Sequence, residues 1–380
     1  MNVGGPAIHA VLLSSSLKDR GWIDVLVCGK ISEHEGDMYY LAREKGLEPL
    51  VIDELGREIN PKKDFAALRK LYSIMKKEKP DIVHTHTAKA GAIGRLAAIL
   101  AGVPVKVHTF HGHVFDGYFS PLKARIFILI EKILALFTDK VIVVSEGVKR
   151  EVTERLKIVS EKKSIVIPLG LELDKFLLSE DYKGVFRKEM GIKGDTLLVG
   201  IIGRLVPIKN HKMFIDAALK IKSALRDYDI KFLVIGDGEL RLDLEAYTKK
   251  IGMAGTIIFT GWIRDLAKVY ADLDLVTLTS LNEGTPVSLI EAMAASKAVV
   301  STDVGGVADL VKDGYNGLLT KADDVDAFCK KAVSILTDPL RRAELGDHAM
   351  RSVADKYSKN RLVHDIDALY KELLKKRGIL

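Results

Sequence analysis

Two glutamates, Glu283 and Glu291, flank a Gly-Thr-Pro turn that joins a strand-like run to a helix-like run. Residues 278–296 read LTSLNEGTPVSLIEAMAAS, which predicts a helix capped by Thr285 with Pro286 at its first position. A helix entered through glycine after a strand presents free backbone N–H groups and the positive end of its dipole, which suit a phosphate. Carboxylates accept hydrogen bonds from sugar hydroxyls. The stretch therefore indicates a ligand with phosphate in the middle and hydroxyl groups at both ends.

A basic loop supplies a partner for that phosphate. Arg204 and Lys209 lie in GRLVPIKN (203–210), directly after the first strand predicted in the second half of the chain. Arginine binds a diphosphate through its planar fork, and lysine binds it as a point charge. An isolated arginine and lysine would more often form an exposed basic loop. Their place at a strand end, in the same predicted domain as the glycine-entered helix, favours diphosphate binding instead.

The elements that must position these residues alternate regularly along the chain. Strands are predicted over 23–28, 49–52, 81–86, 105–110, 140–145, 164–167, 196–203, 230–236, 256–260, 273–278 and 298–302, with helices between most of them. This alternation predicts doubly wound parallel sheets, in which ligands bind at the carboxyl ends of the strands. We therefore expect an α/β fold with two Rossmann-like domains that face a central cleft.

Domain boundaries follow from the same pattern. The first domain is expected over 1–170 and the second over 171–357, followed by a helix over 358–380 that packs back towards the first domain. The Gly-Gly turn near the start leads into a helix without the strand that normally precedes such a turn. The first domain is therefore expected to lack its first strand.

Three motifs carry a resemblance to a known family. EGTPVSLIEAMA (283–294), GRLVPIKN (203–210) and the amino-terminal GGP resemble the retaining nucleotide-sugar glycosyltransferases of family 4, which have the two-domain GT-B fold. The resemblance covers almost the whole chain. It implies a hexosyltransferase-type enzyme that moves a sugar from a nucleoside-diphosphate donor to an acceptor hydroxyl, in cell-surface polysaccharide or glycolipid synthesis. It implies neither a metal nor another cofactor, because Arg204, Lys209 and the helix start at Thr285–Pro286 stabilise the charge that develops on the departing diphosphate. It implies no protein base either, because the departing phosphate helps to take the acceptor proton.

The resemblance also assigns roles to single residues. Arg204 and Lys209 would bind the donor diphosphate, Glu291 the ribose, and Glu283 the transferred sugar. His111, in HTFHGHVF (108–115), matches a histidine near the reacting sugar. The expected catalytic set is His111, Arg204, Lys209 and Glu283. The remaining expected donor contacts are Gly5 from the first domain, Gly238, Trp262 and Ile263 at the nucleobase, and Gly284, Thr285, Pro286, Val287 and Glu291.

Five histidines within thirty residues raise the alternative of a zinc site. Paired members are separated by one residue on a strand or loop, no cysteine is near, and the spacing matches no standard zinc site. Histidines at strand ends that line a polar cleft explain the cluster without a metal, so we expect none. The five are His84, His86, His108, His111 and His113.

The acceptor is expected in the first domain, as a glycan or a lipid-linked glycan. His113, Lys89 and Arg95 are candidates for contacts with it, although a solvated helix start explains the two basic residues equally well. Two alternatives keep the fold and change the activity: a nucleotide-sugar epimerase or phosphorylase-like enzyme, and a sugar-nucleotide-binding protein without activity.

Composition limits the partners further. The chain has 58 basic and 51 acidic residues, for a net charge of +7, without the basic block typical of nucleic-acid-binding arms. Its two cysteines lie far apart in the sequence, which fits a reducing cytoplasm. The helix predicted over 120–137 is apolar nearly all round, but Glu131 and Lys132 interrupt its apolar run, so it is not expected to span a bilayer. Burial is favoured over membrane contact. We expect a cytoplasmic protein, with peripheral binding at the inner face of the membrane as the second alternative.

Overall fold

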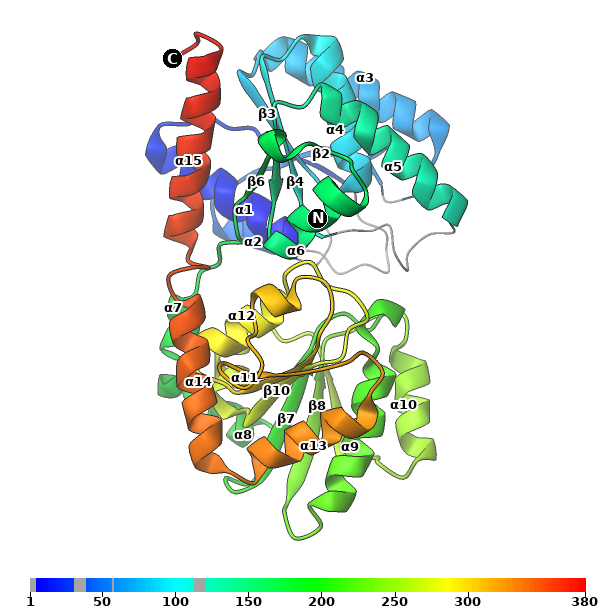
Figure 1. The fold of residues 1–380 in the computed structure, drawn as a ribbon, viewed down its shortest axis with the longest axis vertical. Helices are drawn as coiled ribbons and strands as arrows, with labels where there is room; N and C mark the ends of the chain where they lie inside the picture. The colour runs from blue at the N-terminus through cyan, green and yellow to red at the C-terminus, as the bar shows by residue number, and fades with distance from the viewer. Residues whose placement is uncertain (1–4, 31–38, 57, 113–120) are drawn as a thin grey trace. The chain divides into compact units, whose positions relative to one another are not determined.

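The computed structural model describes residues 5–30, 39–56, 58–112 and 121–380 (Figure 1). The chain divides into two compact units: unit 1 comprises Met1–Leu171 and Lys359–Leu380, and unit 2 comprises Glu172–Ser358. Each is a mixed α/β structure whose strands pair in parallel. The predicted fold class is confirmed.

Unit 2 contains a six-stranded sheet in the order β12-β11-β10-β7-β8-β9. The strands are β7 (Leu197–Ile202), β8 (Ile230–Ile235), β9 (Ile257–Gly261), β10 (Leu275–Leu278), β11 (Val299–Thr302) and β12 (Leu318–Thr320). Every residue of β10 and β11 is buried, as expected for strands that helices cover on both faces. The chain runs outward from β7 in one direction through β8 and in the other through β10. The order therefore reverses between β7 and β10, which is where open parallel sheets bind ligands.

The helices of unit 2 bury one face against this sheet. They are α7 (Asp174–Leu177), α8 (Val185–Glu189), α9 (His211–Ala224), α10 (Arg241–Lys250), α11 (Leu266–Asp272), α12 (Val287–Ala294), α13 (Val325–Leu336) and α14 (Pro339–Val353), with short turns η4 (Ser179–Tyr182), η5 (Pro207–Lys209) and η6 (Val307–Asp309). Phe214 of α9, Phe232 of β8 and Phe328 of α13 belong to one fully buried cluster. This core holds the strand ends in fixed positions.

Unit 1 contains two separate sheets rather than one. Strands β1 (Val27–Gly29) and β2 (Leu50–Ile52) form a parallel pair. The other sheet has the order β3-β4-β5-β6, with β3 (Ile82–His86), β4 (Val105–Phe110), β5 (Lys140–Val143) and β6 (Ser164–Val166). The single doubly wound sheet expected for this domain is thus split, because β1 and β3 are not hydrogen-bonded to each other in the described part of the chain.

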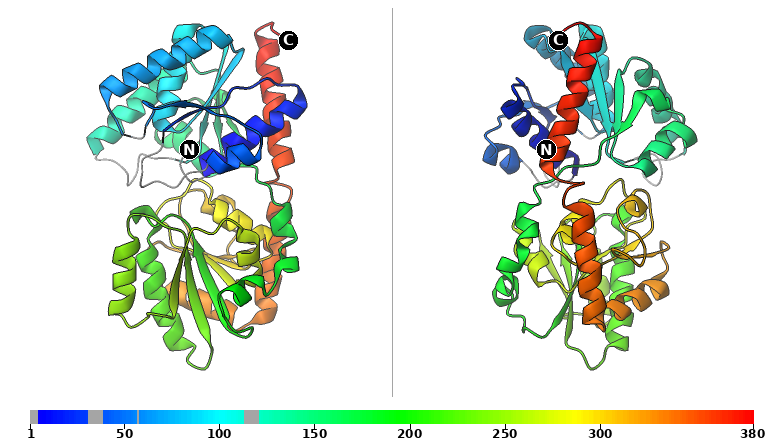
Figure 2. Two further views of the ribbon diagram at one scale, coloured as in Figure 1. Left: turned by 180° about the vertical axis from the view of Figure 1, so that it is seen from behind. Right: turned by 60° about the vertical axis from the view of Figure 1, so that its left-hand side comes forward.

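The helices of unit 1 include one from the end of the chain. They are α1 (Gly5–Leu17), α2 (Tyr39–Glu44), α3 (Pro61–Glu78), α4 (Ala88–Ala101), α5 (Pro121–Leu136), α6 (Glu146–Arg150) and α15 (Lys359–Lys376), with short turns η1 (Lys18–Arg20), η2 (Glu151–Arg155) and η3 (Glu161–Lys163). Helices α1 and α15 lie side by side (Figure 2). Leu13 of α1, Leu369 of α15 and Val107 of β4 share one buried cluster. Residues distant in sequence thus complete the core of this unit.

Candidate active site

Loops that follow four strands of unit 2, together with the end of β9, are joined at one edge of the sheet by backbone hydrogen bonds. The bonds link the β7 and β8 loops (Leu205 N to Asp237 O, 2.9 Å), the β8 loop and the last residue of β9 (Gly236 N to Gly261 O, 2.9 Å), the β7 and β10 loops (Leu281 N to Ile208 O, 2.8 Å), and the β10 and β11 loops (Gly306 N to Glu283 O, 3.0 Å). Because the strands are parallel, these segments all lie at their carboxyl ends. This edge is therefore a continuous and well-fixed surface.

Lys209 and Glu283 meet across the point where the strand order reverses. The Lys209 ammonium lies 2.5 Å from Glu283 Oε1, and the Ser280 hydroxyl donates to the same oxygen at 2.6 Å. The side chains of Lys209 and Glu283 are 22% and 10% exposed. The sequence assigned these residues to separate parts of a ligand, whereas the structure shows that they also form an ion pair with each other. Ser280 was not predicted as a site residue.

Glycines allow these loops to approach one another closely. Gly305 has a φ of +54°, and a Cβ on it would lie 2.0 Å from the Glu283 carbonyl oxygen. A Cβ on Gly238 would lie 2.6 Å from the carbonyl oxygen of Leu205. Any side chain at either position would push a neighbouring loop away, so glycine is required to hold the Glu283 backbone and the Arg204–Leu205 segment in place.

The helix after β10 begins one residue later than predicted. Helix α12 starts at Val287, and Pro286 is its N-cap with an extended backbone, so Thr285 is not the cap. The φ of Pro286, −74°, suits either position, which is why the sequence did not distinguish them. The Thr285 hydroxyl is buried, and no described residue is hydrogen-bonded to it.

The start of α12 presents unpaired donors. Among the residues that the structure describes, none accepts a hydrogen bond from the backbone N–H groups of Gly284, Thr285, Val287 or Ser288. They lie directly after the ion-paired Glu283, in the first turn of a helix whose dipole is positive at this end. Such a group of donors suits an anionic ligand.

Glu291 lies further along α12, in a half-buried environment. The hydroxyl of Tyr270, on α11, lies 3.1 Å from Glu291 Oε2 and 3.0 Å from the Ser288 carbonyl oxygen. Burial raises the pKa of Glu291 to about 7, and the positive charge of Lys175 and the Tyr270 hydroxyl oppose part of that rise. Tyr270 was not predicted from the sequence, because nothing in its local pattern distinguishes it from a core aromatic.

We expect Glu291→Gln to stabilise the chain at neutral pH. Between the ordinary pKa of glutamate and about 7, folded Glu291 keeps a proton that the unfolded chain has lost, so the free energy of unfolding falls as the pH rises through this window. Glutamine carries no such charge and should gain roughly 2–3 kcal/mol over the wild type by pH 8, but little near pH 4.5. Urea unfolding at both pH values measures this, and an equal difference at both would contradict it.

The remaining predicted residues of unit 2 surround the same loops. Arg204 is half-buried, and its guanidinium donates to no other described residue. Trp262, directly after β9, is 45% exposed, and Ile263 is half-buried. Arg241, at the start of α10, forms ion pairs with Asp237 and Glu245 at 2.8 Å each. Arg204 is thus a half-buried cation available to a ligand at this edge.

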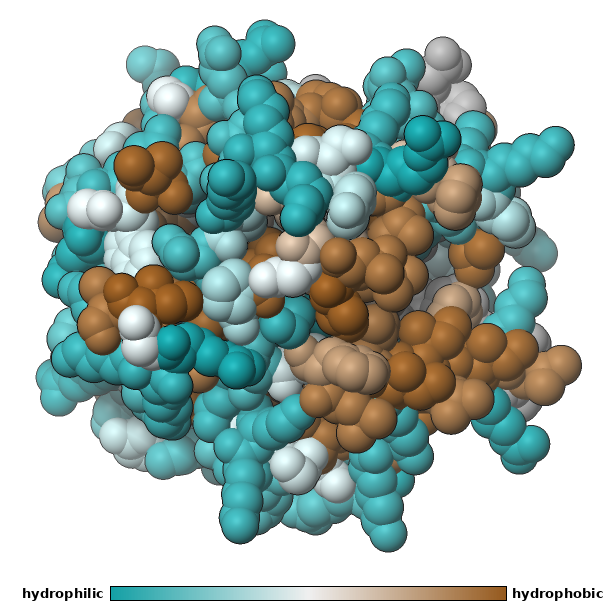
Figure 3. All heavy atoms as spheres, turned by 90° about the horizontal axis from the view of Figure 1, so that it is seen from above, coloured by the Kyte–Doolittle hydropathy of each residue, from teal (hydrophilic) through white to brown (hydrophobic). Residues whose placement is uncertain are grey.

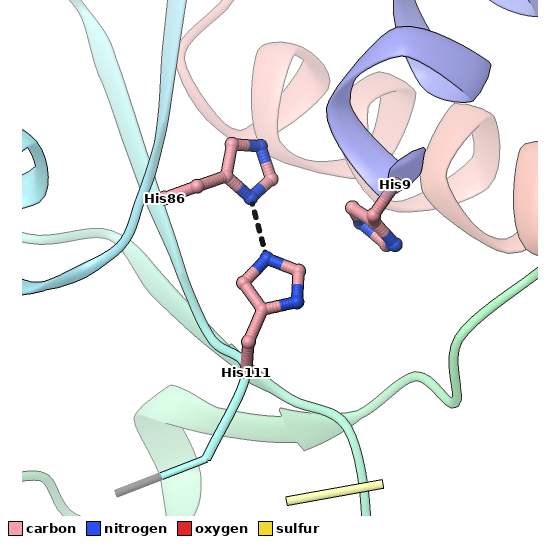
Figure 4. A group of neighbouring side chains, drawn as sticks. All are labelled: His9, His86 and His111. Carbon is pink, nitrogen blue, oxygen red and sulfur yellow. Dashed lines mark hydrogen bonds between the residues drawn. The ribbon is translucent and has the colours of Figure 1, made fainter. Parts of the chain in front are cut away.

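Unit 1 places His111 in a cluster with two other histidines (Figure 4). Nε2 of His111 lies 3.0 Å from Nδ1 of His86, and the ring of His9, on α1, lies edge-on to both. Burial lowers the pKa of His86 to about 4 and, together with the neighbouring imidazoles, holds the pKa values of His9 and His111 well below 6.5. All three are therefore neutral at pH 7. His9 was missed, although its place one turn after Gly5, at the start of α1, could have indicated it.

Two of the five clustered histidines have packing roles instead. His84 lies between the Tyr370 hydroxyl at 2.6 Å and the Thr109 hydroxyl at 2.7 Å, and Nδ1 of His108 lies 2.9 Å from the Thr85 hydroxyl. Both ring nitrogens of His84 and Nδ1 of His108 are thus engaged in hydrogen bonds. His84 nevertheless lies beside His86, two residues away on β3, with ring centroids 4.3 Å apart.

Comparison with known proteins identifies the family. Residues 3–175 match the model described as Glycosyltransferase Family 4, and residues 196–338 match that described as Glycosyl transferases group 1. The UDP-Gal:alpha-D-GlcNAc-diphosphoundecaprenol alpha-1,3-galactosyltransferase of Escherichia coli is 33% identical over 291 residues, which are 76% of this chain and 74% of that protein. This chain belongs to the family 4 glycosyltransferases. It is therefore an enzyme of the hexosyltransferase type.

Other relatives extend the match along the chain. The capsular polysaccharide biosynthesis glycosyltransferase CapM of Staphylococcus aureus is 26% identical over 373 residues, covering 92% of this glycosyltransferase and 96% of CapM. The crystal structure of Anabaena HepE in complex with UDP has a TM-score of 0.80 at 20% identity, covering 97% of this chain and 96% of HepE. The structural likeness shows the GT-B fold that the sequence motifs predicted.

The residues predicted to contact the acceptor have different surroundings in this glycosyltransferase. Lys89 forms an ion pair with Asp64 at 2.6 Å and donates to the Glu58 carbonyl. Arg95 was a wrong candidate, because its side chain is 1% exposed and pairs with Glu131. His113 lies outside the described residues. Gly5 is the first residue of α1, and its approach to the donor phosphate stays a prediction.

Helix α5 of the glycosyltransferase exposes a broad apolar face. The prediction that burial is favoured for this helix is wrong for that face. No helix in the described part of the chain is long and apolar enough to cross a membrane. We call the exposed surface the α5 patch (Figure 3); its residues, 39–72% exposed, are Leu122, Ile126, Leu129, Ile130, Ile133 and Leu136, with Phe137 just beyond the helix, and Leu96 and Leu100 of α4 are also exposed.

The Arg95–Glu131 pair joins α5 to α4 beneath this surface. Nη2 of Arg95 lies 2.7 and 2.6 Å from the two carboxylate oxygens of Glu131, and Nε donates to the Gly91 carbonyl at 3.0 Å. The two side chains are 1% and 4% exposed. Burial raises the pKa of Glu131, while the adjacent guanidinium opposes that rise. The one acidic residue of α5 is thus buried and neutralised, which leaves Lys123, Arg125 and Lys132 as the charged residues of the helix.

Proposed function

We propose that this glycosyltransferase moves a sugar from a nucleoside-diphosphate donor to a hydroxyl group of a lipid-linked glycan, with retention of the anomeric configuration. The observation that supports this most directly is the group of unpaired N–H donors at 284–288 beside the Lys209–Glu283 pair. Donors of this kind, at the switch point of a parallel sheet, suit the diphosphate of a nucleotide sugar.

The proposed reaction breaks the bond between the sugar C1 and the β-phosphate oxygen. The electron pair leaves with the diphosphate, and the Arg204 guanidinium, the Lys209 ammonium and the start of α12 stabilise the charge that develops on it. The acceptor oxygen bonds to C1 on the same face, and its proton passes to the departing phosphate. This route needs neither a protein base nor a metal ion. Glu283 and His111 orient the transferred sugar in this scheme, and Glu291 binds the ribose hydroxyls.

The names of the relatives support both substrates. The Escherichia coli relative is named for a UDP-sugar donor and a diphosphoundecaprenol-linked acceptor, and CapM for capsular polysaccharide biosynthesis. We extend these two classes, a nucleotide sugar and a polyprenyl-diphosphate glycan, to this chain. The transferred sugar and the nucleobase of the donor are to be identified by experiment.

Transfer assays with a panel of nucleotide sugars test the proposal. Donors are first ranked by the rise in melting temperature that each produces, since a ligand that binds the folded state stabilises it. The best donor is then incubated with a polyprenyl-diphosphate-linked sugar, and NMR of the product reports the anomer. An inverted product would overturn retention. Release of free nucleotide and a changed sugar without any acceptor would point to the epimerase alternative.

Removal of divalent ions should leave transfer unchanged. Because the cationic side chains and helix start are proposed to stabilise the leaving diphosphate, treatment with EDTA should change kcat by less than about twofold, well below the effect of losing one charge-stabilising donor. The rate is measured before and after treatment, and again after Mg²⁺ is restored. A loss with EDTA that Mg²⁺ reverses would show that the reaction uses a metal.

We further propose that the α5 patch binds the surface of an anionic membrane, where a lipid-linked acceptor resides. An apolar face on a helix that carries three cationic side chains, and whose own acidic residue is buried, matches such a surface in both hydrophobicity and charge. Lys123, Arg125 and Lys132 supply these cations, since Glu131 is buried against Arg95. The bound chain would then reach an acceptor without crossing the bilayer.

The double variant Leu129→Glu with Ile133→Glu should weaken binding to vesicles of anionic phospholipid by at least about tenfold, because it places two charges on the apolar face. Sedimentation with vesicles measures this, and added salt should weaken binding by the wild type. Leu242→Glu is the matched control, because Leu242 is 78% exposed on α10 of unit 2. Equal sedimentation of all three proteins would remove the patch as the membrane-binding surface.

A further inference from the structure

Three histidines of unit 1 bring ring nitrogens together from three separate elements. His9 comes from α1, His86 from the end of β3, and His111 directly follows β4 (Figure 4). One nitrogen from each ring lies within 4.8 Å of the other two, and His86 Nδ1 and His111 Nε2 are 3.0 Å apart. The His9 ring is T-shaped to the other two, the His86 and His111 rings are tilted relative to each other, and the centroids are 4.9–5.4 Å apart.

Several of these nitrogens have no hydrogen-bond partner in the part of the chain that the structure describes. His9 is 1% exposed, and neither of its ring nitrogens is hydrogen-bonded to a described residue. Nδ1 of His111 is also buried, and no described residue is hydrogen-bonded to it. A buried imidazole has one donor and one acceptor to satisfy, and leaving them unpaired costs about 1–3 kcal/mol each. Both ring nitrogens of the neighbouring His84 are hydrogen-bonded, as is Nδ1 of His108, so the unpaired nitrogens are a property of the cluster and not of the whole region.

We propose that His9, His86 and His111 form a reversible binding site for Zn²⁺ or a similar imidazole-binding transition-metal ion, with a fourth coordination position left open. Three neutral imidazoles and an open position are a known zinc donor set. Tetrahedral Zn–N bonds of about 2.0–2.1 Å place ligand nitrogens about 3.3 Å apart, which lies between the shortest and longest separations here. Small ring rotations would therefore complete the site. The ion would replace the proton shared by His86 and His111.

The charges around the cluster indicate moderate affinity. No described aspartate or glutamate belongs to the group, so the ion would keep its full charge. Arg361 of α15 adds positive charge near His9, although it forms an ion pair with Asp365 at 3.1 Å. A buried and uncompensated dication is costly, so we expect binding in the micromolar range and not the far tighter binding of structural zinc sites.

A bound ion would inhibit transfer. This consequence depends on the proposed function, in which His111 contacts the reacting sugar. Coordination would occupy the His111 nitrogen that lies beside His86 and would hold the ring in place between His9 and His86. Zinc would then be an inhibitor of an enzyme whose reaction itself needs no metal.

Titration of the metal-free protein with Co²⁺ and Zn²⁺ tests the site. Wild-type protein should bind one Co²⁺ with the visible absorption of a tetrahedral centre, and Zn²⁺ should displace it. His9→Ala and His86→Ala should each weaken binding by at least about tenfold, since even lost outer-shell partners cost 10- to 100-fold. His364→Ala is the matched control, because His364 is exposed on α15 of the same unit.

The outcomes test the metal-binding site and the inhibition of transfer separately. Two histidine substitutions are used so that one variant remains if the other lowers the melting temperature. Cobalt binding that neither folded variant weakens, or that is octahedral, would overturn the site. Tetrahedral binding together with zinc inhibition of the wild type, weaker in His9→Ala, supports both steps. Tetrahedral binding without inhibition supports the site and instead overturns the proposed contact between His111 and the sugar.

Discussion

Replacing Arg204 with alanine should lower kcat/KM by about 10²- to 10³-fold while leaving the melting temperature within about 2 °C of the wild type. Removing one preorganised donor that stabilises developing charge has an effect of this size. The stability should change little, because the guanidinium makes no hydrogen bond to another described residue. Steady-state kinetics with the best donor, alongside thermal unfolding, measure both quantities.

Arg226→Ala provides the control, since Arg226 is exposed in the same unit and, among the described residues, donates only to the nearby Ser223 carbonyl. Arg204→Lys should recover only part of the lost rate, because a point charge does not reproduce the planar fork. An Arg204→Ala enzyme with the wild-type rate would contradict its place at the diphosphate. If the fold were lost instead, Arg204 would have a structural role that the contacts do not show.

Lys209→Ala should reduce kcat/KM by about 10²-fold, through two effects at once. It removes a cation from the proposed diphosphate site, and it leaves the 10% exposed Glu283 carboxylate without its ionic partner. The two effects can be separated with Glu283→Gln. If the two residues act as one unit, kcat/KM of the double variant should fall by a much smaller factor than the product of the factors for the two single variants.

The wild type, Lys209→Ala, Glu283→Gln and the double variant should be compared in free energy of unfolding and in affinity for the donor. Lys212→Ala is a matched control, because Lys212 forms an exposed ion pair of similar length with Asp216 on α9, at 2.7 Å. It should change kcat/KM by less than twofold. Strictly additive losses for Lys209→Ala and Glu283→Gln would show that the ion pair has no role when the donor is bound.

The fold followed from the sequence because its signals are local. Runs such as Leu197–Ile202 and Leu275–Leu278 are apolar throughout, as strands buried on both faces must be, and the glycine turns mark where they end. The start of α12 was predicted to within one residue for the same reason. Its remaining error concerned Pro286, whose fixed φ fits both the N-cap and the first helical position.

Most residues of the site could be predicted from the sequence, but the contacts between them could not. Lys209 and Glu283 are 74 residues apart, and only the parallel pairing of β7 and β10 brings their loops together. His9 lies on helix α1, whereas His86 ends β3 and His111 directly follows β4. No spacing in the sequence therefore relates His9 to His111. The exposed face of α5 was also missed, since a helix that is apolar nearly all round has no periodicity to show which side faces outward.

The Arg95–Glu131 pair compensates for that missing periodicity. A helix with hydrophobic side chains on nearly every face can pack in several rotational settings of similar energy, and packing alone selects weakly among them. The pair removes this degeneracy, because any other rotation about the axis of α5 would leave a charge buried and unpaired. We expect an apolar pair of similar volume to retain the stability of the unit while loosening the orientation of α5. The ion pair would then be maintained for conformational specificity more than for stability.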